Sequence, residues 1–211
     1  MMRLIDVIRT RIRILMRTIA RMLNILTRGK LHPDLVTTVG VVMHIPIALL
    51  IASRHMYWLA ALLLLIFGLF DALDGELARL QKRASPKGML LDASTDRMKE
   101  VLLYTGAAYA LALSNHPATA AWAAAACGAS LCVSYVKARG EVAVASLETQ
   151  GKISHADSNS MFKDGILSFE VRMFVLIVGL LSGYLIFAVA FIAIFAAYTA
   201  FVRLARIMRK L

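Results

Sequence analysis

The sequence predicts an all-α integral membrane protein with six transmembrane helices, preceded by an N-terminal amphipathic interfacial helix. Hydrophobic residues make up 60% of the 211 residues, whereas soluble domains are usually about 45–50% apolar. The mean hydropathy is +0.71. Several apolar stretches approach or exceed the roughly 17–25 residues that a helix needs to cross a bilayer.

Residues 1–30 form a separate basic segment before the membrane domain, which we expect to span residues 31–211. Seven arginines and Lys30 stand against one acid, Asp6, and isoleucines and leucines alternate with them. This pattern is typical of a helix that lies in an anionic leaflet. Charges interrupt every apolar run, so the segment is not a signal peptide. Nucleic-acid binding is disfavoured because the rest of the chain is apolar.

Six spans follow from the apolar stretches and their interruptions. The first is 35–53, opened by the helix-starting pair Pro33-Asp34. The second is 57–70, which we expect to continue as a helix through residue 79. The stretches 101–136 and 173–202 lack Asp, Glu, Lys and Arg and are split at residues 114–118 and 182–183. Residues 140–164 form the longest predicted loop.

The basic residues predict the orientation of the chain. Nearly all of them lie in residues 3–30, 82–97, 137–163 and 203–210, which six spans place on one side. The opposite loops carry only Arg54. The positive-inside rule therefore predicts a multi-pass protein of the cell membrane, with both termini and the acidic cluster in the cytoplasm.

That acidic cluster is the main chemical signal. Asp71 and Asp74 are spaced i,i+3, and Asp92 and Asp96 are spaced i,i+4, so each pair shares a helix face. The short link between them contains Ser85-Pro86 and can turn the chain back. Four adjacent carboxylates repel one another, and oxygen-preferring cations such as Mg²⁺ remove that conflict. Two divalent cations bridged by such carboxylates can stabilise the attacking and leaving oxygens in a phosphoryl transfer.

Two further residues favour a phosphate ligand. Gly75 leaves room for a ligand to approach the helix backbone, and Arg79, one turn later, can donate two hydrogen bonds to a phosphate. The alternative is a solvated helix–loop–helix whose acids pair with neighbouring Lys and Arg residues. That alternative does not explain the regular spacing of the acids with Gly75, Arg79 and Gly88.

The pattern D-x2-D-G-x2-A-R-x8-G-x3-D-x3-D at residues 71–96 resembles the signature of the CDP-alcohol phosphotransferases. The resemblance implies that Asp71, Asp74, Asp92 and Asp96 bind two Mg²⁺ ions, with Mn²⁺ as the alternative metal. Asp96 would also be the general base. The implied reaction is attack of an alcohol on the β-phosphorus of a CDP-linked donor, with release of CMP. The residues that would contact the CDP-diacylglycerol donor are Asp34, Leu35, Val36, Thr37, Gly75, Arg79 and Ser85.

The run Ser134-Tyr-Val-Lys137-Ala-Arg139-Gly-Glu141 resembles bacterial phosphatidylinositol-phosphate synthases, which implies inositol 1-phosphate as the acceptor. Phe169 departs from this pattern, because an arginine typically stands there. The residues implied to bind the acceptor phosphate are Ser134, Lys137, Arg139, Arg172 and Arg203.

Other acceptors and assemblies stay open. A phosphatidylglycerophosphate synthase, with glycerol 3-phosphate as the acceptor, is the closest alternative. A cation transporter also carries intramembrane acids, but the four acids here lie at one end of the spans and in one half of the chain. The alanine-rich third and fourth spans permit close helix packing and predict a homodimer.

Overall fold

The computed structural model describes residues 2–149 and 167–209, and every regular element in them is a helix. In chain order these are α1 (Met2–Leu26), α2 (Pro33–Ser53), α3 (Tyr57–Gly68), α4 (Phe70–Leu80), α5 (Pro86–Ala112), the 3₁₀ turn η1 (Pro117–Thr119), α6 (Ala120–Thr149), α8 (Phe169–Ser182) and α9 (Leu185–Met208). The all-helical prediction is confirmed.

The helix boundaries follow from local chemistry. Pro33 and Pro86 occupy the first turns of α2 and α5, where a missing backbone N–H costs nothing. The Ser85 hydroxyl accepts a hydrogen bond from the N–H of Gly88 at 3.1 Å and caps α5. Gly183 ends α8 with a φ of 75°, a left-handed conformation that glycine adopts without steric cost. The break predicted at 182–183 is therefore confirmed, and the break at 114–118 is confirmed because α5 ends at Ala112 and α6 begins at Ala120.

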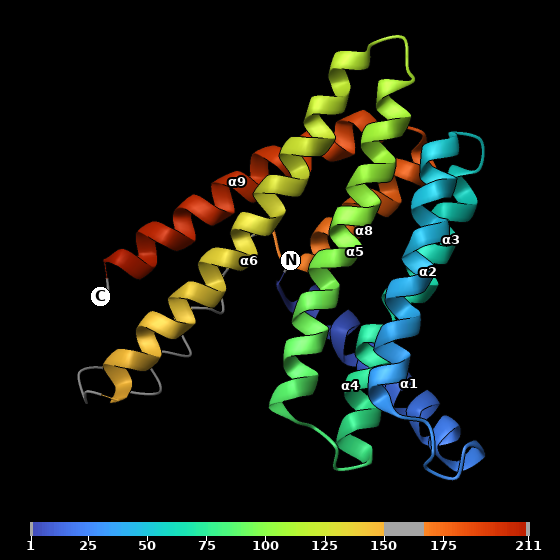
Figure 1. Cartoon of the computed structure of the whole chain (residues 1–211), viewed down its shortest axis with the longest axis vertical. Helices are drawn as coiled ribbons and strands as arrows, with labels where there is room; N and C mark the ends of the chain where they lie inside the picture. Colours follow the sequence, from blue (N-terminus) through green and yellow to red (C-terminus); the bar gives the residue numbers. More distant parts are fainter. Residues whose placement is uncertain (1, 150–166, 210–211) are drawn as a thin grey trace.

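Helices α2, α4 and α5 form one group, in which α2 packs against both α4 and α5 and α1 packs on α4. In Figure 1, α6 and α9 lie side by side and slant away from this group. Helices α2, α3, α5, α6, α8 and α9 share one apolar core. The contact between α2 and α5 is very close, because a Cβ added at Gly106 would clash with the carbonyl oxygen of Ala48.

Within the described residues, four segments are long and apolar enough to span a membrane: Pro33–Ser53, Tyr57–Leu80, Pro117–Ser146 and Leu185–Met208. Large apolar side chains on them are exposed, such as Leu49 and Phe187, as expected for surfaces that face lipid. The chain is thus a membrane protein. Helix α5 carries charges in its first half, and α8 has only 14 residues, so six spans stay a prediction, as does the interfacial position of α1.

The expected helix through residues 57–79 is present as one apolar segment, Tyr57–Leu80, with a one-residue irregularity at Leu69 that separates α3 from α4. One expectation about helix continuity needs correction. Residues 140–149 are not part of a loop, because α6 continues to Thr149. This extension contains alanine, leucine and glutamate, which favour helix. The remainder of the predicted loop, 150–164, lies outside the described residues.

Candidate active site

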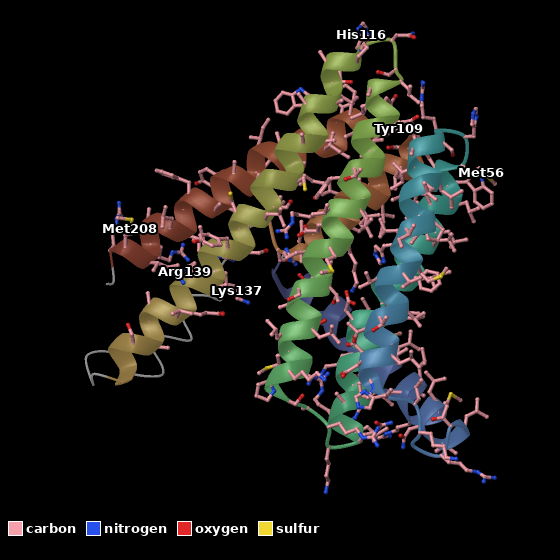
Figure 2. The ribbon with its side chains drawn as sticks, viewed as in Figure 1. Met56, Tyr109, His116, Lys137, Arg139 and Met208 are labelled. Atoms are coloured by element: carbon pink, nitrogen blue, oxygen red, sulfur yellow. The ribbon has the colours of Figure 1, made fainter. Side chains whose placement is uncertain are left out.

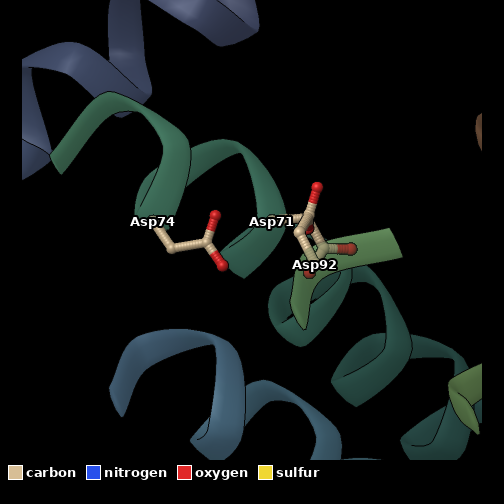
Figure 3. Close-up of side chains that lie close together, drawn as sticks. All are labelled: Asp71, Asp74 and Asp92. Atoms are coloured by element: carbon tan, nitrogen blue, oxygen red, sulfur yellow. The ribbon is translucent and has the colours of Figure 1, made fainter. Parts of the chain in front are cut away.

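Three of the four aspartates lie together where α4 and α5 meet. Asp71 and Asp74 come from α4, and Asp92 comes from α5 (Figure 3). One carboxylate oxygen from each residue lies within 4.8 Å of the others. Such a set of oxygens suits a divalent cation, which binds carboxylate oxygens at roughly 2.0–2.6 Å.

The hydrogen bonding of this group also fits a cation. Oδ2 of Asp71 and Oδ1 of Asp92 are buried and have no hydrogen-bond partner among the described residues. A buried, unpaired carboxylate oxygen is costly. A divalent cation between the carboxylates would give both atoms a partner, so the residues present fit such an ion.

Thr37 on α2 holds the carboxylate of Asp74 in place. Its buried hydroxyl donates a hydrogen bond to Oδ2 of Asp74. Sequence reasoning assigned Thr37 to the CDP site, whereas in the structure it contacts one of the predicted metal ligands. A hydrogen bond of this kind orients a ligand and tunes its affinity for a metal.

Asp96 lies beside the group of three, in direct side-chain contact with Asp71, and Lys99 bridges these two carboxyl groups. The ammonium nitrogen of Lys99 donates to Oδ1 of Asp71 and lies 3.4 Å from Oδ1 of Asp96. Sequence reasoning missed Lys99, although its i,i+3 spacing from Asp96 was a usable signal. Arg97 also reaches Asp96, with 3.5 Å between Nη2 and Oδ2.

Asp92 and Asp96 on α5 precede residue 101, where the third predicted span begins. Burial raises the pKa of Asp92, and the neighbouring Asp96 raises it further. Burial and the nearby Asp71 raise the pKa of Asp96 to about 6. Both shifts reflect the cost of keeping several carboxylates charged in a small, partly buried volume.

Gly75 and Arg79 lie one turn apart on the same face of α4, as the sequence predicts. A Cβ added at Gly75 would lie 3.5 Å from Nη2 of Arg79, so the guanidinium lies over the glycine backbone. Nη2 of Arg79 donates to Oε1 of Glu76 at 2.8 Å, and Nε of Arg13 on α1 donates to the same oxygen at 3.0 Å. A cavity of about 560 Å³ opens here, lined by Arg13, Ile14, Arg17, Glu76, Arg79 and Leu80.

The other predicted donor contacts occupy different environments. Asp34 lies 3.6 Å from Nδ1 of His32, and Leu35 is exposed. Val36 is buried in a small apolar cluster with Leu73 and Leu77. Ser85 is exposed at the start of α5, where it caps the helix.

The cations predicted to bind the acceptor do not all point into one place. Lys137 and Arg139 are exposed on α6 (Figure 2), and Lys137 lies 3.7 Å from Glu141. Arg172 is buried; its Nε donates to Oε1 of Glu100 at 2.8 Å and its Nη1 donates to the carbonyl of Leu167 at 2.9 Å.

Arg203 on α9 is only partly satisfied. Its Nη1 donates to the carbonyl of Val133 at 3.1 Å. Its buried Nε has no hydrogen-bond partner among the described residues. An unpaired buried donor of this kind is a position where an anion would be stabilised.

Arg97 and Glu100 complete a network that sequence reasoning missed. Nη1 of Arg97 donates to Glu100 and, at 2.5 Å, to the hydroxyl of Ser134. The Arg97 guanidinium also lies over the ring of Phe169, 5.1 Å from its centroid, which is a cation–π contact. Phe169 therefore supports a cation from α5 at the position where an arginine was expected.

Comparison with known proteins agrees with this arrangement. Residues 30–197 match the family model described as CDP-alcohol phosphatidyltransferase. The phosphatidylinositol phosphate synthase of Cutibacterium acnes is 30% identical over 149 residues, which cover 69% of each chain. The enzyme of the same name from Corynebacterium glutamicum is 36% identical over 121 residues, which cover 56% of this chain and 55% of the relative.

The fold is also that of a solved structure. The phosphatidylinositol phosphate synthase of Mycobacterium tuberculosis, with CDP-DAG bound, superposes with a TM-score of 0.74 at 23% identity, covering 91% of this chain and 92% of the other. The same protein in complex with manganese and citrate gives a TM-score of 0.73 at 23% identity, covering 92% and 88%. With a family match over most of its length, the chain is a member of the CDP-alcohol phosphatidyltransferase family.

Proposed function

We propose that this protein transfers the phosphatidyl group of CDP-diacylglycerol to inositol 1-phosphate and releases CMP. The observation that carries the proposal is the group formed by Asp71, Asp74 and Asp92, with two buried carboxylate oxygens that have no described hydrogen-bond partner. The names of the two curated relatives support the acceptor. The CDP-DAG bound to the Mycobacterium tuberculosis protein supports the donor.

The site residues would hold a divalent cation, Mg²⁺ or Mn²⁺. Asp71, Asp74 and Asp92 would be its ligands, and the resemblance to the family adds Asp96 and a second ion. The manganese complex of the Mycobacterium tuberculosis protein supports the use of a divalent metal. When bound, such an ion neutralises charge on the pyrophosphate of the donor.

The donor would lie along the first turns of α2 and over α4. Arg79 would donate hydrogen bonds to a phosphate, because its side chain is about half exposed and lies over Gly75. Gly75 would let that phosphate approach the helix backbone. The hydroxyl of Ser85 and the segment Asp34, Leu35, Val36 and Thr37 would border the nucleotide.

Asp96 would be the general base. The acceptor oxygen forms a bond to the β-phosphorus while the bond from that phosphorus to the CMP oxygen breaks. Asp96 takes the proton of the acceptor hydroxyl, and CMP leaves with the electron pair of the broken bond. A base in this role contributes about 10²–10⁴-fold to the rate.

The acceptor phosphate would bind near Ser134, Lys137, Arg139, Arg172 and Arg203. The unpaired Nε of Arg203 supports an anion here. Arg172 is already paired with Glu100, so we propose that it contributes positive charge while it keeps this contact. The exposed Lys137 and Arg139 would attract the acceptor from solution.

We also propose six spans, cytoplasmic termini, a cytoplasm-facing active site and a homodimer. The distribution of basic residues supports the orientation. The alanine-rich first half of α6, where Trp122 and other side chains are exposed, supports a face that packs against a second copy.

The test is product analysis with purified protein, CDP-diacylglycerol, Mg²⁺ and one acceptor at a time. The acceptors are inositol 1-phosphate, glycerol 3-phosphate, serine and free inositol. We expect CMP release together with a phosphatidylinositol phosphate product. CMP release with glycerol 3-phosphate alone would keep the reaction class and overturn the acceptor. No CMP with any acceptor would overturn the proposed function.

A further inference from the structure

Helix α1 packs on α4 through an apolar face, which sets its position over α4. Met16 and Ala20 of α1 are buried and belong to one cluster with Leu73 and Leu77 of α4. Arg13 lies about one turn before Met16 on the same helix. The apolar contact therefore holds a basic side chain of α1 beside α4, at a defined place in the fold.

The side chain that Arg13 meets on α4 is Glu76, which is 7% exposed. Oε1 of Glu76 accepts two hydrogen bonds, from Nη2 of Arg79 at 2.8 Å and from Nε of Arg13 at 3.0 Å. A buried carboxylate is costly unless it is paired. Here two guanidinium groups share one negative charge, so one positive charge remains uncompensated within the three side chains.

This surplus positive charge lies at the cavity between α1 and α4. The cavity, about 560 Å³ in volume, is lined by Arg13 and Arg17 of α1 and by Glu76 and Arg79 of α4. Three cations against one acid favour an anionic ligand. The Arg79 side chain is 53% exposed and lies over Gly75, so the same guanidinium lines the cavity and lies at the proposed donor contact.

We propose that Arg13 is a positioning residue for the CDP-diacylglycerol donor and acts through Glu76 on Arg79. While Arg13 compensates Glu76, Arg79 keeps positive charge and free N–H donors for a phosphate. Without Arg13, Glu76 would neutralise Arg79 and hold it away from the donor. Helix α1 is thus part of the donor site. The inference rests on the proposed function, because it takes the donor contact of Arg79 from there.

The alternative role of Arg13 is attraction to anionic lipid, which its 69% exposed side chain would also allow. The two roles depend on the surroundings in different ways. The hydrogen bond to Glu76 lies within the protein and persists in a neutral detergent micelle. Attraction to a charged leaflet is absent there, so kinetics in neutral detergent separate the two roles.

The test measures CMP release by purified protein in neutral detergent micelles, with varied CDP-diacylglycerol and saturating inositol 1-phosphate and Mg²⁺. We expect Arg13→Gln to raise KM for the donor about tenfold, the effect of losing a hydrogen bond to a charged group, with kcat within about twofold of wild type. Arg13→Lys keeps the charge and a donor, so KM should stay within about threefold of wild type.

The matched control is Arg21→Gln, which removes the same charge from the same helix. Arg21 is exposed and lies outside the cavity lining, so its replacement should leave KM and kcat at their wild-type values. An unchanged KM in Arg13→Gln, or equal increases in Arg13→Gln and Arg21→Gln, would overturn the inference.

Glu76→Gln tests whether Arg13 acts through Glu76. The amide keeps the size of the side chain and removes the charge that Arg13 compensates. In this background Arg13→Gln should change KM for the donor by less than about twofold, which is the non-additivity expected of coupled residues. A tenfold increase in both backgrounds would show that Arg13 acts on the donor without Glu76 and would contradict the proposal.

Donor binding without turnover gives a second readout. CDP-diacylglycerol, added without an acceptor, should raise the melting temperature of wild type and Arg21→Gln more than that of Arg13→Gln, because a ligand stabilises according to its affinity. Equal stabilisation of all three would overturn this inference alone. Stabilisation of wild type by the donor without CMP release from any acceptor would overturn the proposed function alone.

Discussion

Nε of Arg172 donates a hydrogen bond to Oε1 of Glu100 at 2.8 Å, and at most 1% of either side chain is exposed. Glu100 also accepts from Arg97, so one carboxylate on α5 compensates two guanidinium groups from α5 and α8. Removing one partner of a buried ion pair leaves an uncompensated charge.

Glu100→Ala is therefore expected to lower the free energy of unfolding by about 3–5 kcal/mol. Thermal unfolding in detergent measures the change. The control is Glu141→Ala, because Glu141 and its partner Lys137 are each 51% exposed, and exposed pairs contribute about 0–1 kcal/mol. Equal losses for the two variants would contradict a structural role for the buried pair.

Thr37→Val tests the support of Asp74. The valine keeps the shape of the side chain and removes the hydroxyl that donates to Asp74. Loss of such a contact typically lowers metal affinity about 10–100-fold, and we expect at least tenfold weaker Mn²⁺ binding by isothermal titration. Thr38→Val is the matched control, since the exposed Thr38 hydroxyl donates only to the carbonyl of Asp34 among the described contacts. Unchanged affinity in Thr37→Val would remove Thr37 from the metal site.

Gly75→Ala tests the approach of a phosphate to α4. The added methyl would lie 3.5 Å from Nη2 of Arg79, an ordinary contact distance, so the fold should persist. The methyl would occupy space between the helix backbone and the guanidinium. We expect kcat/KM for CDP-diacylglycerol to fall about tenfold, which corresponds to about 1.4 kcal/mol. Gly68→Ala, with no neighbour within 4 Å, should retain wild-type kinetics, and equal effects would speak against a donor site at Gly75.

Asp96→Asn tests the base. The amide cannot accept the proton of the acceptor hydroxyl, so we expect the rate of CMP release to fall about 10²–10⁴-fold. The melting temperature should stay near that of wild type, because the amide keeps the size of the side chain. Turnover close to wild type would show that another group accepts the proton.

The predicted orientation is tested by cysteine labelling in intact cells. In a background with Cys127 and Cys132 replaced by serine, Ala84→Cys lies between α4 and α5, and His116→Cys lies between α5 and α6. A membrane-impermeant maleimide should label position 116 and not position 84. The opposite pattern would reverse the orientation derived from the basic residues.

Local signals in the sequence predicted three of the helix boundaries. Pro33, Pro86 and Gly183 act within one turn of chain, through a missing donor or a left-handed φ, so neighbouring residues suffice to read them. The pairing of Gly75 with Arg79 was predictable for the same reason, because both lie on one face of a single helix.

Contacts between distant helices were not predictable in this way. The spacing of Lys99 from Asp96 is visible in the sequence, but its burial against Gly40 of α2 and its contact with Asp71 of α4 are not. Arg172 was expected to face a ligand, but Glu100 of α5 pairs with it. In both residues the charge is satisfied by a partner at least 28 residues away, and a single sequence does not show which helix faces will meet.

The close contact between Gly106 and Ala48 has a mechanical consequence for the site. It joins α2 and α5 at a point about 21 Å along α5 from Asp92, since 14 residues separate the two positions. Thr37 and Asp92 both lie beyond this contact, toward the first turns of α2 and α5. A relative rotation of about 5° at this contact would move Asp92 by about 1.8 Å, which is enough to change how tightly the carboxylates enclose an ion.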